Sequence, residues 1–388
     1  VILLAVLALI GLLRFASNTK HQKQSLETYA QTVVETCKNT SYKPPCYEKE
    51  VPKLLENISM EEAFKVTSII QEKDKEYVYC HVLGHELSAR ETKKNPEAWK
   101  EVVTRCPSGV CSNGCIHGAF QERFRAESLP DAEINELKAE LEGACETRTG
   151  FSPTPLEQAT CYHALGHLTM YITGASIEKS LALCSELAKK KDGRDFSAIC
   201  FDGVFMQIYQ PLEPEDFALV KGKEQSKNTV EVFCSGYKGE QLSSCWNESW
   251  PLFWQGIKEK PVELVTFCSH LDETQRKDCY TDLFYVITAL FNFDERKLEQ
   301  YCLQLPQPVK GQCFANAASR MIETDWTMLD RSITLCQKAV DNNRDQCFDE
   351  LVFFSKFNYH PDSPEQGQLC NSLPNPWKEE CISEIERK

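Results

Sequence analysis

The chain has 388 residues, 20 of them cysteine, and its 57 acidic and 43 basic side chains give a net charge of −14. An acidic chain without a block of lysine and arginine is poorly suited to neutralising a phosphate backbone, which argues against nucleic acid as a partner. The length allows two or three ordinary domains or one long repeat array.

The N-terminal segment is apolar. Residues 1–13 form an almost unbroken apolar run, and Arg14, Lys20 and Lys23 follow it. A helix needs about 20 apolar residues to span a bilayer, so the run fits either the core of a signal peptide or the end of an anchor helix. Ala16 has Leu13, not a small residue, three positions before it. We therefore favour an uncleaved membrane anchor over residues 1–19, followed by a linker or first helix over residues 20–36.

The cysteines indicate a cellular compartment. Their even number and regular spacing are typical of disulfides, which persist in oxidising surroundings. A cytosolic zinc protein would instead carry Cys-x2-Cys pairs, and the sequence contains none. We expect an extracytoplasmic protein, whether secreted, periplasmic or at the cell surface.

The cysteine spacing also predicts the fold. The last five pairs repeat with a constant period of 34 residues, beginning at Cys234, Cys268, Cys302, Cys336 and Cys370. A fixed period of this length is typical of stacked helical repeats. Each pair straddles a turn between two amphipathic stretches. The sequence therefore predicts an all-α protein, an alpha/alpha superhelical solenoid of roughly nine disulfide-stapled hairpins. Residues 37–230 hold irregular repeats with histidines, and residues 231–388 hold regular ones.

Ten disulfides are expected from this register. Eight of them each close one hairpin: Cys37–Cys46, Cys145–Cys161, Cys184–Cys200, Cys234–Cys245, Cys268–Cys279, Cys302–Cys313, Cys336–Cys347 and Cys370–Cys381. Among the other four cysteines, the register pairs Cys106 with Cys115 and leaves Cys80 for Cys111. The alternative is that one of these pairs stays as free, reactive thiols.

The cysteine pairing and the period loosely resemble those of the disulfide-stapled alpha/alpha repeats of the Sel1-like class, and the length matches that of tetratricopeptide repeats. The resemblance covers residues 37–388. It implies an alpha/alpha solenoid and suggests a binding role.

Five of the eight histidines fall at one phase of the repeat. Two registers carry His-x-Leu-Gly-His, with His81 and His85 in one and His163 and His167 in the other. Each is followed by a register with a single polar residue before a glycine, His117 in the first case and Asp202 in the second. Histidines four residues apart on a helix share one face, which is a chelating geometry.

This pattern predicts two metal sites. The first is formed by His81, His85 and His117, and the second by His163, His167 and Asp202. The donors suit a transition metal, namely Zn, Fe, Mn or Cu. One site that shares all five histidines would require a tight superhelix. Haem is disfavoured because no Cys-x2-Cys-His motif is present to attach it.

Two functional hypotheses remain. In one, the protein is a metal-binding protein, or a metal-dependent hydrolase or oxidoreductase in which Glu86 or Glu122 acts as a general base. A surface carboxylate is the simpler interpretation of both residues. In the other, the protein is a non-catalytic scaffold whose concave groove binds a peptide or protein.

Overall fold

The computed structural model describes residues 25–107, 109–124, 128–211, 214–340, 342–361 and 363–386. Within these residues every regular element is a helix, and the β pairing amounts to two isolated bridges. The predicted all-α class is therefore confirmed. The chain divides into two compact units, Val1–Tyr77 and Val78–Lys388. The apolar run over residues 1–13 lies outside the described residues.

None of the described helices combines the length and the apolar character needed to cross a membrane.

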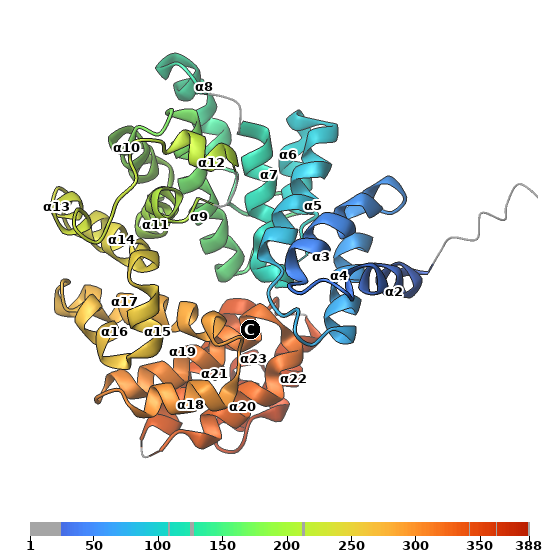
Figure 1. Cartoon of the computed structure of the whole chain (residues 1–388), viewed down its shortest axis with the longest axis vertical. Helices are drawn as coiled ribbons and strands as arrows, with labels where there is room; N and C mark the ends of the chain where they lie inside the picture. Colours follow the sequence, from blue (N-terminus) through green and yellow to red (C-terminus); the bar gives the residue numbers. More distant parts are fainter. Residues whose placement is uncertain are drawn as a thin grey trace, which may run out of the picture. The chain divides into compact units, whose positions relative to one another are not determined.

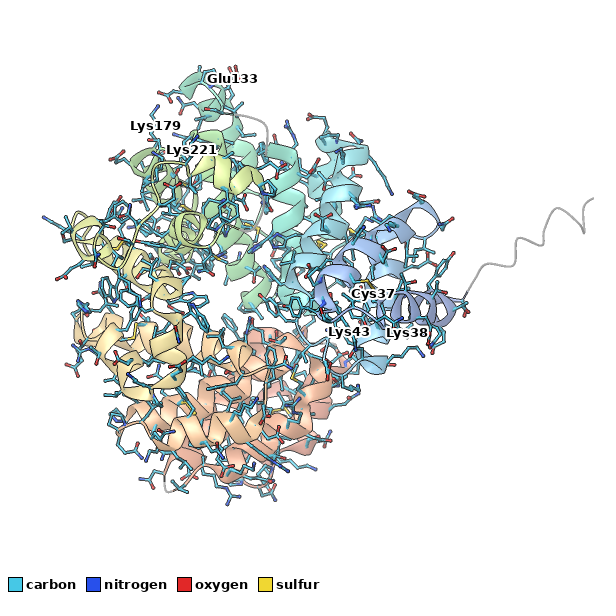
Figure 2. The ribbon with its side chains drawn as sticks, in the orientation of Figure 1. Cys37, Lys38, Lys43, Glu133, Lys179 and Lys221 are labelled. Carbon is cyan, nitrogen blue, oxygen red and sulfur yellow. A yellow bond between two sulfur atoms is a disulfide. The ribbon has the colours of Figure 1, made fainter. Side chains whose placement is uncertain are left out.

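The first unit contains α2 (Leu26–Cys37), α3 (Pro44–Glu50), the 3-10 helix η1 (Val51–Glu56) and α4 (Met60–Lys73). A capping box begins α4, in which Ser59 and Glu62 satisfy each other's backbone N–H groups. Lys43, labelled in Figure 2, and the Tyr47 hydroxyl donate to Asp74 Oδ2 at 2.9 and 2.6 Å. These bonds tie α3 to the residue that follows α4.

The second unit is built on a row of helices that we call the central row. Its first helix starts directly after Cys80, and each later one contains the second cysteine of a pair. Each helix of this row contacts the next one along the chain (Figure 1). The row consists of α5 (His81–Lys94), α7 (Gly114–Phe124), α9 (Pro155–Ile172), α11 (Ser197–Tyr209), α14 (Glu240–Glu248), α17 (Glu273–Leu290), α19 (Val309–Thr324), α21 (Asn343–Asn358) and α23 (Trp377–Glu386).

A second set of helices, which we call the flanking row, forms the first helix of each hairpin. Each of these helices contains the first cysteine of a pair or ends a few residues before it. Most of its members pack on the central helix that follows them. The row consists of α6 (Trp99–Thr104), α8 (Asp131–Glu142), α10 (Ile177–Leu187), α13 (Val230–Cys234), α16 (Pro261–Cys268), α18 (Glu295–Leu303), α20 (Leu329–Lys338) and α22 (Pro364–Ser372). Short connecting helices are η2 (Pro96–Ala98), η3 (Val110–Asn113), α12 (Pro214–Leu219), η4 (Trp250–Leu252), α15 (Trp254–Glu259) and η5 (Trp326–Met328).

All twenty cysteines, each of which lies in the described part of the chain, form disulfides. The ten pairs are those predicted from the register. Nine close short loops, and each such loop contributes on the order of 3 kcal/mol by the chain-entropy model. Cys80–Cys111 differs because it spans 31 residues and joins the start of α5 to η3.

The central row of the second unit folds back on itself. Helix α21 contacts α9, and α19 contacts η3, although these elements are far apart in sequence. Just beyond α21, His360 Nε2 lies 3.2 Å from Glu157 Oε2 on α9. In an open solenoid each repeat touches only its neighbours, so these contacts show that the row curves strongly.

Candidate metal centre

The first group of histidines lies where α5 packs on α7. His81 and His85 are one turn apart on α5, and their Nε2 atoms are separated by 3.0 Å. His117 on α7 places its ring centroid 5.1 Å from that of His81 and 5.2 Å from that of His85. One ligand atom from each of the three residues lies within 4.8 Å of the others. Two nitrogens bound to one tetrahedral ion at their usual bond lengths would be roughly 3.3 Å apart, so this group could hold a metal ion.

The second pair lies on α9, which packs on the other side of α7. His163 Nε2 and His167 Nε2 are 3.2 Å apart. The ring centroid of His117 lies 5.4 Å from that of His163 and 5.6 Å from that of His167. The sequence pattern predicted two separate groups, but the structure brings all five histidines together because α7 contacts both α5 and α9. We call these five residues the histidine cluster.

Glycines bring the helices close enough to form this cluster. A Cβ atom at Gly118 of α7 would overlap the His85 carbonyl oxygen of α5. In the same way, a Cβ at Gly166 of α9 would overlap the Cys200 carbonyl oxygen, and one at Gly203 of α11 would overlap that of His163. These glycines therefore serve close backbone packing, one of the two roles that their position in helices suggests.

Acceptors on the far side of two rings orient them. His81 Nδ1 lies 3.3 Å from the Cys111 carbonyl oxygen, and His167 Nδ1 lies 2.7 Å from Gln207 Oε1. A proton on Nδ1 bonded to such an acceptor leaves the Nε2 lone pair free to bind a metal. The Nε2 atom of His117 is buried and has no hydrogen-bond partner. These nitrogens are thus prepared to act as ligands.

The carbonyl that orients His81 belongs to an unusual loop. Cys111, Ser112 and Asn113 all have positive φ, at 53°, 49° and 56°. Each such residue costs of order 1 kcal/mol or more, and it persists only where the surroundings enforce it. The disulfide from Cys111 to Cys80, the residue before His81, supplies that constraint.

Burial keeps four of the clustered histidines neutral. It lowers the pKa of His81 to about 4, with the Arg320 charge adding to the effect. Burial also lowers the pKa values of His117 and His163 well below the usual range, and the neighbouring histidines lower both further. The pKa of His167 is lowered by burial, against the opposing effects of Gln207 and Asp216. Neutral imidazole is the form that binds metals.

A cavity opens beside the cluster. It offers about 30 Å³ to the centres of water-sized groups, whereas a single water needs roughly 10–15 Å³. There is therefore room for an ion and a small exogenous ligand. Four clustered histidines line it, together with Gln121, Ala164, Leu168, Tyr171, Met206, Gln207, Gln210 and Asp216.

The carboxylate of this cavity is Asp216, on the short helix α12. It is 3% exposed, accepts a hydrogen bond from the Tyr171 hydroxyl, and accepts another from Gln121 Nε2 at 3.2 Å. None of these three residues was predicted from the sequence to belong to the site. Only Gln121 had a recognisable signal: it lies four residues after His117, at the spacing that separates His163 from His167.

The predicted ligand Asp202 lies elsewhere. Its side chain bonds to Ser244 on α14, and burial raises its pKa to about 6. Among the described residues, His163, His167 and Asp202 do not form a three-ligand group of metal-binding size. The physical reason is that α11 packs on both α9 and α14, and Asp202 serves the contact with α14.

The two glutamates considered as general bases also lie outside the cavity lining. Glu86 Oε2 is 3.6 Å from Arg90 Nε on the partly exposed side of α5. Glu122 follows Gln121 on α7. The structure thus places Asp216, and neither glutamate, at the histidines.

Comparison with known proteins gave no match: no protein-family model, no curated protein and no solved structure is significantly similar to this chain. The resemblance to Sel1-like repeats therefore extends no further than cysteine pairing and period.

We predict that Gly166→Ala destabilises the protein, because the added methyl group would overlap the Cys200 carbonyl oxygen. Overpacking of this kind costs about 1–3 kcal/mol, more than the gain of about 1 kcal/mol in helix propensity. Denaturant unfolding with disulfides intact measures the change. Gly367→Ala on α22 is the control, since its Cβ would meet nothing within 4 Å and the variant should be unchanged or more stable. Equal stability of the two variants would contradict the packing role.

We also predict that Glu248→Gln stabilises the protein at pH 8 but has little effect at pH 4. Burial, followed by the charges of Asp202 and Asp282, raises the pKa of Glu248 well above its usual range. When the pKa of a carboxyl group is higher in the folded than in the unfolded state, the protein loses stability as the pH rises from the unfolded-state pKa through the folded-state pKa. The amide removes that loss and still accepts a hydrogen bond from Gln210 Nε2, which lies 2.7 Å from Glu248 Oε2.

Denaturant unfolding of both proteins at the two pH values measures this difference. A gain of equal size at pH 4 and pH 8 would show that the carboxylate charge is not its cause.

Proposed function

We propose that this protein binds a transition-metal ion through the Nε2 atoms of His81, His85 and His117. The observation that carries the proposal is the Nε2 atom of His117, which is buried and has no hydrogen-bond partner. The His117 ring packs against His85, which is 7% exposed, and against His81, which has intermediate exposure. A buried nitrogen without a partner is costly in a folded protein. A bound metal ion would remove that cost.

The donor set narrows the choice of metal. Imidazole nitrogens suit Zn, Cu, Fe and Ni, whereas Mn prefers oxygen ligands. Because the Asp202 side chain on α11 bonds to Ser244 on α14, the argument for a two-histidine, one-carboxylate site no longer applies. Zn, Cu and Fe are therefore favoured over Mn among the four metals expected from the sequence.

Three protein ligands leave a coordination position open, as in catalytic zinc sites. The cavity beside the cluster gives a small molecule access to that position. The Tyr171 hydroxyl, which donates to Asp216, places polar groups on the cavity wall beside that position. This arrangement supports a metal-dependent reaction on a small substrate more than it supports a purely structural ion.

The disulfides indicate where the protein works. Twenty bonded cysteines in ten pairs favour an oxidising, extracytoplasmic environment. We propose that the metal is acquired and used there.

His117→Ala should weaken metal binding by about 100-fold or more, because it removes the ligand that bridges the cluster. The protein is produced with its disulfides intact, stripped with a chelator, and titrated with Zn(II), Co(II) and Cu(II) by calorimetry and elemental analysis. His270→Ala is the matched control, since His270 packs against Trp246 at a ring-centroid distance of 4.2 Å and is not one of the five clustered histidines.

The wild-type protein is expected to bind at least one equivalent of metal, and the control the same amount. Circular dichroism and unfolding of the metal-free variants show whether both retain the fold. A wild-type protein that binds none of these ions would overturn the proposal, as would a folded His117→Ala variant with unchanged affinity.

A further inference from the structure

A soft sulfur donor lies at one end of the histidine cluster. Met206 on α11 places its Sδ atom 3.2 Å from His163 Nε2. The same nitrogen is 3.2 Å from His167 Nε2. Three potential ligand atoms from two helices therefore meet at His163, outside the group formed by His81, His85 and His117.

Hydrogen bonding alone cannot satisfy these atoms. If Nδ1 of His167 donates to Gln207 Oε1, then Nε2 of His167 is an acceptor. The thioether sulfur of Met206 is also an acceptor. A single proton on His163 Nε2 can form a hydrogen bond either to Met206 Sδ or to His167 Nε2. In the contact without the proton, two lone pairs then face each other. A cation between the three atoms would satisfy all of them.

The separations agree with this interpretation. Ligands bound to one tetrahedral ion, with nitrogen at about 2.0–2.1 Å and sulfur at about 2.3 Å, lie roughly 3.3–3.5 Å apart. The two observed separations of 3.2 Å are close to that value.

Met206 does not have the position of an ordinary core methionine. It lines the cavity and has intermediate exposure. Met170 on α9, by contrast, is fully buried and does not line the cavity. A methionine that only filled space would resemble Met170.

We propose that His163, His167 and Met206 form a second metal site that prefers Cu(I). Thioether sulfur is a soft ligand that selects Cu(I), and imidazole accepts copper as well. The inference rests on the proposed function in that both sites share the cavity and the His117 ring. It goes further by assigning two ions to each chain and by giving the second site a metal preference of its own.

The test is an anaerobic titration of the chelator-stripped protein with Cu(I), against the chromophoric competitor bicinchoninate and with ascorbate as reductant. Before the titration, the three-histidine site is filled with one equivalent of Zn(II). The wild-type protein is then expected to bind one further equivalent of Cu(I). Met206→Leu, which keeps the side-chain volume, should weaken that equivalent at least 10-fold. Met170→Leu is the matched control and should bind as the wild type does.

X-ray absorption of the copper-loaded protein provides a second measurement. A sulfur atom should coordinate copper in the wild type and in Met170→Leu, and only nitrogen or oxygen atoms should do so in Met206→Leu. All cysteine sulfurs are in disulfides, so the thioether is the expected source of this signal.

The two proposals fail in different ways. If Zn(II) binds, its binding is weakened by His85→Ala, and no further Cu(I) binds, then the second metal site does not exist and the proposed function stands. Unchanged Cu(I) affinity in Met206→Leu, or copper without a sulfur ligand in the wild type, would also overturn the second site. If neither Zn(II) nor Cu(I) binds the wild-type protein, both proposals fail.

Discussion

Direct backbone contact between neighbouring helices of the central row is the constraint on which the candidate site depends. At Gly118, Gly166 and Gly203 there is no space for a Cβ, because a carbonyl oxygen of the adjacent helix occupies it. Helix axes normally lie 8–10 Å apart when side chains separate them. Removing the side chain at the crossing lets the flanking histidines of two helices reach one another, and it also fixes their relative height. The same glycines lower the intrinsic helix propensity of the segments that carry them. Packing between the helices must therefore stabilise these segments as helices.

The disulfides act on a different scale. Nine of them close individual hairpins and thereby stabilise units whose apolar faces are too small to fold alone. Cys80–Cys111 instead joins α5 to the loop whose carbonyl orients His81. This one disulfide therefore helps to fix the orientation of the His81 ring, because it holds the loop that carries the Cys111 carbonyl. The others leave the cluster to be shaped by helix packing.

Much of the fold could be predicted from the sequence because disulfide register and helical periodicity are local properties. The all-α class, the ten pairs and the set of five histidines follow from spacing along the chain. The union of those histidines into one cluster could not be predicted, since it depends on α7 packing on both α5 and α9, and spacing along the chain does not determine that packing. Asp216 was missed because it comes from a short helix outside the repeat. Asp202 shares its register with His163, yet it serves a contact with α14, and register does not show which neighbour a side chain faces.

The contact between α21 and α9 has a consequence for how such a protein can change over evolutionary time. An open repeat array gains or loses units freely, because each unit touches only its neighbours. Here the insertion of one more 34-residue unit before α21 would move that helix away from α9 and break the pairing of His360 with Glu157. The number of repeats is therefore fixed by closure, as the number of strands is in a barrel.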